Sequence, residues 1–324
     1  MKALITGATG FMGARLCKAL AERGDEIRAL VLPGEDYSHI SRFISEAREG
    51  DITNPASLVG LAEGVDVVYH LAARVVDYGS HDDFYKPILY GTRNMLEACA
   101  GRAGRFVYVS SICACGTGRH MKGLAESDEC QKTGVHYGDA KLEAEILVKS
   151  HAADFPKGFV IARPDTVIGP RSVWVAELGK MMRDSIFTYF DGGRFSAGLI
   201  YIDDLVDGLV LCGAEDQAAG QTYFFRDDWE ITWKQYLDDL AVLFGKKIRF
   251  SLPFKFAWAL GYVSERISQP LGFRPMITRH AVGILGRDLN VDCSKAKREL
   301  GWKTRVSYDD AMKEIKLWVK ENMT

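Results

Sequence analysis

This sequence of 324 residues has few cysteines and no CxxC motif. Its seven cysteines are odd in number and never spaced as CxxC, which argues against a disulfide framework and against a zinc site. Cys113 and Cys115 stand close together, but no further ligands follow at a suitable spacing. We therefore predict reduced, mostly buried thiols and no bound metal. The cysteines are Cys17, Cys99, Cys113, Cys115, Cys130, Cys212 and Cys293.

Blocks of like charge and long hydrophobic runs are missing as well. The formal net charge of -2 does not indicate a nucleic-acid or acidic-lipid surface, so we expect small-molecule partners. The least polar stretch, 250–273, contains Lys255, Glu265 and Arg266 and is too interrupted to span a membrane. It predicts a buried amphipathic helix, with contact to a membrane surface as the alternative. Residues 1–6 show no features of a secretory signal, which predicts a cytoplasmic location.

Short apolar runs alternate with helical patterns over the first two thirds of the chain. Amphipathic segments such as 14–23 and 90–100 separate these runs. The repetition predicts right-handed βαβ crossovers and an α/β fold, a Rossmann-type doubly wound parallel sheet. The predicted strands are 3–6, 26–32, 66–72, 105–111 and 159–164.

After position 164 the elements become shorter and aromatic residues more frequent. This change predicts a smaller C-terminal substrate lobe, formed by about 166–199 and 226–324. The dinucleotide-binding domain would then comprise 1–165 plus about 200–225, because 201–212 has the pattern of a helix that packs back on the first lobe.

A glycine loop follows the first predicted strand. The sequence TGATGFMG at 6–13 places Gly7, Gly10 and Gly13 directly before a helix. Gly7 allows a tight turn, Gly10 lets backbone N–H groups approach a pyrophosphate, and Gly13 lets the helix pack on the strand. This context predicts the binding of a dinucleotide, NAD or NADP.

The acid that usually binds the adenosine ribose is missing. It is expected about 20 residues after the glycine loop, at the end of the second strand, where 29–33 read ALVLP. Arg28, His39 and Arg42 are nearby candidates for contacts with a 2'-phosphate. The sequence therefore leaves NAD and NADP open.

Seven motifs in register resemble those of the extended short-chain dehydrogenase/reductase superfamily. Within it, LGRDLNVDCSKAKRELGW at 285–302 is similar to the 3β-hydroxysteroid dehydrogenase type. Nucleotide-sugar epimerases are similar too, but usually carry Asn in the motif that reads RPDT at 163–166 here. The resemblance implies a redox enzyme acting on an alcohol or ketone of sterol-like or other lipid-like character. The motifs are TGATGFMG (6–13), GDIT (50–53), HLAA (70–73), SS (110–111), YGDAK (137–141), RPDTVIGP (163–170) and YIDDLVDG (201–208).

The resemblance implies that Ser111, Tyr137 and Lys141 are catalytic. Tyr137 and Lys141 are four residues apart, on one face of a helix. A free tyrosine has a pKa of about 10, and a nearby ammonium with the positive nicotinamide ring would lower it towards working pH. Tyr137 would exchange a proton with the substrate oxygen, Ser111 would hydrogen-bond that oxygen, and Lys141 would hold the nicotinamide ribose and tune Tyr137. Without this register, the pair of serines would read as an ordinary turn at a strand end.

The resemblance also implies a set of cofactor contacts. Asp51 would meet the adenine, with a turn or a helix cap as the competing interpretation. Ala72 and Ala73 are small enough to let the cofactor pass, and Pro164 would lie near the carboxamide or form a structural turn. The predicted cofactor-binding residues are Gly7, Thr9, Gly10, Phe11, Met12, Gly13, Asp51, Ile52, Leu71, Ala72, Ala73, Tyr137, Lys141 and Pro164.

Some residues receive structural interpretations. His70 is expected to pack in the core, and Asp203 and Asp204 to cap a helix N-terminus. Ile88 stands where the superfamily often has Asn, so a proton relay through that position is not expected, and Asn94 is not at the matching position. Six aromatic residues are expected in the core, with an apolar substrate pocket as the alternative. They are Trp229, Trp233, Tyr236, Phe254, Phe256 and Trp258.

These observations predict an NAD(P)-dependent oxidoreductase that moves a hydride between nicotinamide and a secondary alcohol or ketone. One alternative is a nucleotide-sugar epimerase or dehydratase, which uses the same three catalytic residues and recycles the cofactor. The other is a non-catalytic, cofactor-sensing protein, although a sensor would not need all three residues. The resemblance also implies a homodimer formed through the helices that contain Asn94 and Tyr137.

Overall fold

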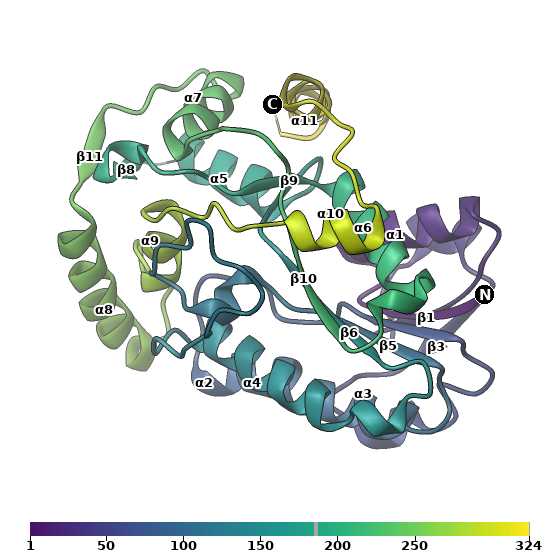
Figure 1. Ribbon diagram of the computed structural model, residues 1–324. Helices are drawn as coiled ribbons and strands as arrows, with labels where there is room; N and C mark the ends of the chain where they lie inside the picture. Colours follow the sequence, from purple (N-terminus) through teal and green to yellow (C-terminus); the bar gives the residue numbers. More distant parts are fainter. Residues whose placement is uncertain (185–186, 324) are drawn as a thin grey trace.

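A seven-stranded parallel sheet forms the centre of the molecule in the computed structural model, which describes residues 1–184 and 187–323 (Figure 1). The strand order β10-β6-β5-β4-β1-β2-β3 confirms the predicted Rossmann-type fold. The direction of strand addition reverses between β1 and β4, and ligands of such sheets bind at the carboxyl ends of the strands at this point. The strands are β1 (Lys2–Thr6), β2 (Glu26–Val31), β3 (Glu46–Glu49), β4 (Val67–His70), β5 (Arg105–Val109), β6 (Phe159–Pro164) and β10 (Gln221–Phe225).

Two of these strands were not predicted from the sequence. β3 reads EARE and lies at the edge of the sheet, half exposed, so it lacks the apolar run that marks a buried strand. β10 follows far along the chain and pairs with β6, with Phe225 opposite Pro164. The sheet therefore ends in a strand that is remote in sequence from the other six.

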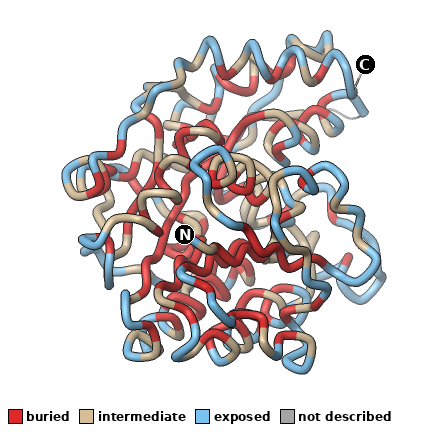
Figure 2. The backbone as a smooth tube through the Cα atoms, turned by 90° about the vertical axis from the view of Figure 1, so that its right-hand side faces the viewer, coloured by how far each residue is buried: buried red, intermediate tan, exposed pale blue. Residues whose placement is uncertain are grey.

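Helices cover both faces of the sheet, as in other doubly wound folds. α3 and α4 lie side by side on one face, and α1 and α6 pack together on the other (Figure 1). Buried positions run through the centre, whereas exposed positions follow the loops and outer helix surfaces (Figure 2). The helices are α1 (Phe11–Glu22), α2 (His81–Tyr85), α3 (Gly91–Cys99), α4 (His136–Ser150), α5 (Val173–Asp184), α6 (Ile202–Ala214), α7 (Trp233–Leu243), α8 (Phe254–Leu271), α9 (Arg279–Leu285), α10 (Ser294–Leu300) and α11 (Tyr308–Asn322).

Beyond the central sheet, two small parallel sheets join segments that are distant in the chain. β7 (Thr166–Ile168) pairs with β9 (Leu199–Tyr201), and β8 (Thr188–Phe190) pairs with β11 (Phe250–Leu252). α5, α7, α8 and α9 accompany these strands on the side of the molecule away from the N-terminus (Figure 1). The division into a dinucleotide domain and a substrate lobe stays a prediction.

The predicted capping role of Asp203 and Asp204 is wrong. Tyr201 occupies the cap position of α6, and no side chain caps this helix. Asp203 forms an ion pair with Arg15 of α1. Asp204 accepts backbone hydrogen bonds from Arg305 and Val306, at 3.0 and 3.2 Å. Both carboxylates therefore connect α6 to other segments of the chain.

The apolar stretch 250–273 contains α8, which is only partly buried. Its buried side chains are Phe254, Ala257, Gly261 and Ser268, whereas Phe256 is 59% and Val263 50% exposed. Within residues 1–184 and 187–323, no helix combines the length and apolar character that a membrane span needs.

Six aromatic residues of the C-terminal part were predicted to pack in the core, and the structure confirms this for five of them. Trp233, Tyr236 and Phe254 are buried, and Trp229 and Trp258 pack against the core. Phe256 is exposed, so the prediction that it packs in the core is wrong.

Candidate active site

The glycine loop lies between β1 and α1, at the carboxyl end of the sheet. Gly7 has φ +68°, and a Cβ there would lie 3.0 Å from the Ala72 nitrogen. A Cβ on Gly13 would lie only 2.0 Å from the Gly7 carbonyl oxygen. Both positions therefore require glycine, as predicted for a loop that approaches a phosphate group closely.

The N-terminus of α1 fits a pyrophosphate. Gly10 precedes the helix in an extended conformation, no side chain caps the helix, and its first turn contains no acidic residue. The first N–H groups of a helix have no partner within it, and the helix dipole favours an anion there. Phe11, Met12 and Gly13 would present these N–H groups, as the sequence predicted.

A series of buried polar side chains lies next to the glycine loop and holds its neighbouring segment in place. Thr6 contacts His70 (Oγ1 to Nδ1, 2.8 Å), and His70 contacts Thr92 (Nε2 to Oγ1, 3.1 Å). Burial lowers the pKa of His70 to about 3, so its ring is neutral. The Ala72 N–H donates to Thr6 (3.1 Å), which holds segment 71–73 beside the glycine loop. His70 is thus a core residue, as predicted, and Leu71, Ala72 and Ala73 line the edge where the cofactor would pass.

Tyr137 and Lys141 lie in the first two turns of α4, and both are buried. The Lys141 ammonium donates to the Val109 carbonyl oxygen (2.8 Å), at the carboxyl end of β5. Ser111 follows two residues after that strand, and its hydroxyl accepts the Cys113 N–H (3.2 Å). The Ser111 hydroxyl also acts on the Tyr137 phenol, because it opposes the rise in the pKa of that group. The structure therefore brings the three predicted catalytic residues together at one strand end.

Burial controls the two titratable groups of this triad. Burial raises the pKa of Tyr137, the Cys113 thiol raises it further, and the Ser111 hydrogen bond opposes the rise. Burial lowers the pKa of Lys141 to about 7, although the Glu145 carboxylate opposes this change. The prediction that Lys141 lowers the Tyr137 pKa finds no support in the protein alone, because burial dominates.

The neighbouring Ser110 has a different role. Its hydroxyl donates to the buried Glu145 carboxylate (2.6 Å), which also accepts two hydrogen bonds from Arg163 (2.9 and 2.6 Å). This network joins β5, α4 and β6. Ser110 is thus a structural residue, and Ser111 is the serine that faces Tyr137.

At the adenosine end, Arg28 is not available to a 2'-phosphate, which corrects the sequence prediction. It is buried and pairs with Glu46 (2.7 Å), and it donates to two backbone carbonyls. His39 contacts the Thr9 carbonyl oxygen (3.1 Å), and Arg42 lies over the Phe43 ring.

An acidic residue that the sequence reasoning missed lies at this end. Glu35 accepts a hydrogen bond from the Thr9 hydroxyl (2.7 Å) and another from the Leu32 N–H (3.0 Å). It stands four residues beyond the end of β2, after a turn at Gly34 with φ +73°. The sequence contains a signal for this position, the Pro33-Gly34 pair. Such a pair favours a turn, and a turn here brings Glu35 back towards the end of the strand.

Asp51 and Ile52 lie near the predicted adenine position. One Asp51 carboxylate oxygen accepts the N–H and the hydroxyl of Thr53, both at 2.8 Å, so the turn interpretation describes its contacts in the structure. Asn94 donates to the Ile52 carbonyl oxygen (2.8 Å) and so fixes this segment. Ile88 is buried in a π-helical turn, Lys86–Tyr90, and offers no side-chain hydrogen bond at the position where the superfamily often has Asn.

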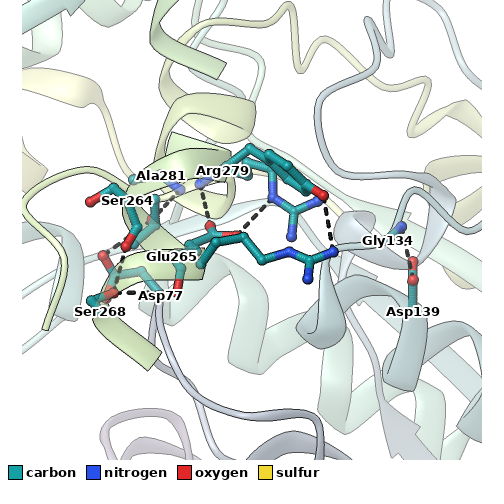
Figure 3. A network of polar contacts seen from close by, with 11 residues as sticks. Asp77, Gly134, Asp139, Ser264, Glu265, Ser268, Arg279 and Ala281 are labelled. Atoms are coloured by element: carbon teal, nitrogen blue, oxygen red, sulfur yellow. Dashed lines mark hydrogen bonds and ion pairs between the residues drawn. The ribbon is translucent and has the colours of Figure 1, made fainter. Parts of the chain in front are cut away.

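A cavity of about 300 Å³ opens beside Tyr137. His280 packs edge-on against the Tyr137 ring, with 5.3 Å between the ring centroids. Figure 3 shows the polar contacts around Glu265 and Arg279, with Gly134 and Asp139 on the α4 side. None of the six aromatic residues discussed for a substrate pocket lines this cavity. Its wall is formed by Asp77, Tyr78, Gly79, Phe84, Gly134, Val135, His136, Tyr137, Tyr262, Glu265, Arg266, Gln269, Arg279 and His280.

The model of the NAD dependent epimerase/dehydratase family matches residues 3–224. The chain belongs to this family. It is 28% identical to a 4-hydroxy-2-methyl-3-oxo-4-farnesyl-3,4-dihydroquinoline-1-oxide ketoreductase from Stigmatella aurantiaca, over 98% of this chain and 96% of that protein. It is 27% identical to a 2-alkyl-3-oxoalkanoate reductase from Stenotrophomonas maltophilia, over 98% of each chain.

Solved structures of this family share the fold. A UDP-glucose 4-epimerase from Thermotoga maritima, solved with UDP-glucose, superposes with a TM-score of 0.78 over all of both chains at 20% identity. The predicted membership of the extended short-chain superfamily is confirmed, and so is an NAD(P)-dependent enzyme of the oxidoreductase type. The individual catalytic and cofactor-binding residues stay predictions, as does the homodimer.

Cysteines and metal-binding residues add no second site. All seven cysteines are free thiols, and six of them are buried, with Cys130 partly exposed. Among residues 1–184 and 187–323, no cluster of three or more metal-ligating side chains could hold a metal ion.

Proposed function

We propose that this enzyme interconverts a ketone and a secondary alcohol, with NAD as the preferred cofactor. The observation that carries the proposal is the convergence of Ser111, Tyr137 and Lys141 at the carboxyl end of β5, beside a cavity that reaches Tyr137. This is the edge of the sheet where the glycine loop also lies, so a dinucleotide on α1 and a substrate in the cavity would share one site.

In this proposal, side chains of the protein transfer the proton and bind the carbonyl oxygen of the substrate. During reduction, Tyr137 Oη donates its proton to the carbonyl oxygen, and the Ser111 hydroxyl hydrogen-bonds the same oxygen. Because burial raises the Tyr137 pKa, the phenol is protonated at neutral pH and ready to act as the acid. Lys141, held by the Val109 carbonyl oxygen, would bind the ribose next to the nicotinamide. The dinucleotide supplies the hydride in this direction and accepts it in the other.

Two observations favour net ketone reduction over nucleotide-sugar epimerisation. Two relatives that the chain matches over nearly its whole length are named as a ketoreductase and a 2-alkyl-3-oxoalkanoate reductase. The cavity volume of about 300 Å³ is at the lower end of the range of about 300 to 1,000 Å³ for ligand pockets, which suits a compact substrate group.

The preference for NAD rests on Glu35. Its carboxylate lies against Thr9 of the glycine loop, just beyond the carboxyl end of β2. The adenosine ribose binds at this position in dinucleotide folds, and a carboxylate there accepts its 2'-hydroxyl but repels a 2'-phosphate.

The test is an assay of the pure protein with NADH and NADPH separately, against a panel of alkyl ketones, 3-oxo compounds and nucleotide sugars. Nicotinamide absorbance and substrate mass are followed together. We expect consumption of NADH with a ketone, and a loss of about 10²- to 10⁴-fold in kcat for Tyr137→Phe, the range of general acid catalysis. Tyr90→Phe changes an exposed tyrosine outside the cavity and serves as the matched control.

Two results would contradict the proposal. Near-normal turnover by Tyr137→Phe would remove the tyrosine from the chemistry. Conversion of a nucleotide sugar at constant nicotinamide absorbance would replace the reductase with the epimerase or dehydratase alternative.

A further inference from the structure

Of the two arginines that line the cavity beside Tyr137, one is paired with a carboxylate of the wall and the other is not. Glu265 accepts hydrogen bonds from the Arg279 N–H (2.6 Å) and from Arg279 Nε (2.8 Å), as Figure 3 shows. Asp77 pairs with Arg274 (2.9 Å) and accepts the Thr278 hydroxyl (3.4 Å). Both acidic residues of the cavity wall therefore already have a cationic partner.

Arg266 has no such partner. It donates one hydrogen bond to the Tyr262 hydroxyl (3.0 Å), and its guanidinium carbon lies 5.3 Å from the centre of the same ring. In the part of the chain that the structure describes, no carboxylate forms an ion pair with Arg266. Arg279 lies over the same ring at 5.1 Å, so two guanidinium groups share the Tyr262 ring, and only Arg279 is paired with the Glu265 carboxylate.

Tyr262 therefore holds the Arg266 side chain without neutralising its charge. The phenol occupies one N–H of the guanidinium, which leaves the other donors of the planar group for a ligand. A guanidinium held in this way matches the two oxygens of a carboxylate, since paired N–H···O bonds are the strongest contacts that arginine forms.

A second polar group of the cavity wall, next to Tyr137, has no hydrogen-bond partner among the described residues. This group is His280 Nδ1, which is buried. Burial lowers the pKa of this imidazole to about 4, so it is neutral at pH 7. A buried polar atom without a partner is unfavourable, which indicates that a ligand brings polar atoms into this cavity.

We propose that the substrate carries a carboxylate on the same short chain as its ketone or alcohol, and that Arg266 binds this carboxylate. The inference rests on the proposed ketone chemistry, with the reacting carbon at Tyr137. Both residues line one cavity of about 300 Å³, so one hydroxy or oxo acid bound in this cavity would lie beside both. Arg266 is then a specificity-determining residue and takes no part in hydride or proton transfer.

The experiment compares 2- and 3-hydroxyoctanoate with their methyl esters as substrates of the complete protein with NAD. The ester keeps the chain and the hydroxyl but removes the charge. We expect one of the two acids to exceed its ester at least 10-fold in kcat/KM. Arg266→Met should remove this preference by raising the KM for the acid. Lys255→Met removes an exposed cation from the same helix outside the cavity and should keep the preference.

Equilibrium dialysis with octanoate and methyl octanoate measures the contact without turnover. Octanoate bound by the wild type and not by Arg266→Met, with no oxidation of any hydroxyoctanoate, would support the carboxylate contact and refute the proposed reaction. Equal kcat/KM values of the wild type for acids and esters would overturn the inference. An acid preference that persists in Arg266→Met would overturn it as well. Oxidation of the esters in that case would leave the proposed hydride transfer standing.

Discussion

The Thr9 hydroxyl donates a hydrogen bond of 2.7 Å to the carboxylate of Glu35. This contact joins the glycine loop to the segment after β2 and places a carboxylate where we propose that the adenosine ribose binds. Glu35→Gln keeps the size of the side chain and removes the charge. We expect the ratio of kcat/KM for NAD over NADP to fall about 10-fold, which corresponds to about 1.4 kcal/mol.

Steady-state kinetics with both cofactors measure this ratio. Glu26→Gln, at an exposed position at the start of β2, is the control and should leave it unchanged. An unaltered ratio in Glu35→Gln would show that the carboxylate does not face the ribose.

The two adjacent serines should respond in opposite ways to alanine substitution. Ser111→Ala removes a hydroxyl that faces Tyr137, so kcat should fall about 10-fold or more while the free energy of unfolding changes little. Ser110→Ala removes a donor to the buried Glu145 carboxylate, so the free energy of unfolding should fall by about 1 to 3 kcal/mol. Kinetics and urea unfolding of both variants distinguish the roles, and the reverse pattern would exchange the assignment.

Burial of Lys141 should destabilise the folded protein less as the pH rises. Its pKa is about 7 in the folded protein and about 10.4 when unfolded, so the unfolded chain binds more protons between these values. The free energy of unfolding therefore rises with pH from about 7 to about 10 on account of this group. Lys141→Met should be inactive, but more stable than the wild type at pH 6. At pH 10 this advantage should be smaller, and thermal unfolding at the two pH values measures the difference.

Asp227 should have the opposite effect on stability. Burial raises its pKa to about 9, and the adjacent Asp204 adds to the rise. The folded protein holds a proton that the unfolded chain has released above about pH 3.9, so stability is lost as pH rises from about 4 to 9. Asp227→Asn keeps an acceptor for the Tyr201 N–H, which the carboxylate binds at 2.7 Å, and its amide replaces the acidic proton.

We therefore expect Asp227→Asn to raise the melting temperature at pH 8 by about 2 °C or more, and to have little effect at pH 4. Glu230→Gln, which changes an exposed carboxylate three residues further along the chain, is the control. A variant that is less stable than the wild type at pH 8 would show that the carboxyl group is ionised in the folded protein.

The sequence by itself determined the parallel sheet, the glycine loop and the Tyr137–Lys141 pair. These features depend on local patterns: apolar runs buried on both faces, glycines where a Cβ would collide, and a spacing of four residues on one helix. The role of Ser111 was implied by a family resemblance and stays a prediction.

Only the tertiary structure decided which charges are available. It showed Arg28 buried against Glu46, Glu35 turned back to Thr9, and Asp203 paired with Arg15 of a distant helix. It also placed Arg266 and His280 in the cavity of Tyr137, although about 130 residues of chain separate them from it. Ion pairs and cavities depend on contacts between remote segments, and no local pattern in the sequence encodes which of these segments meet.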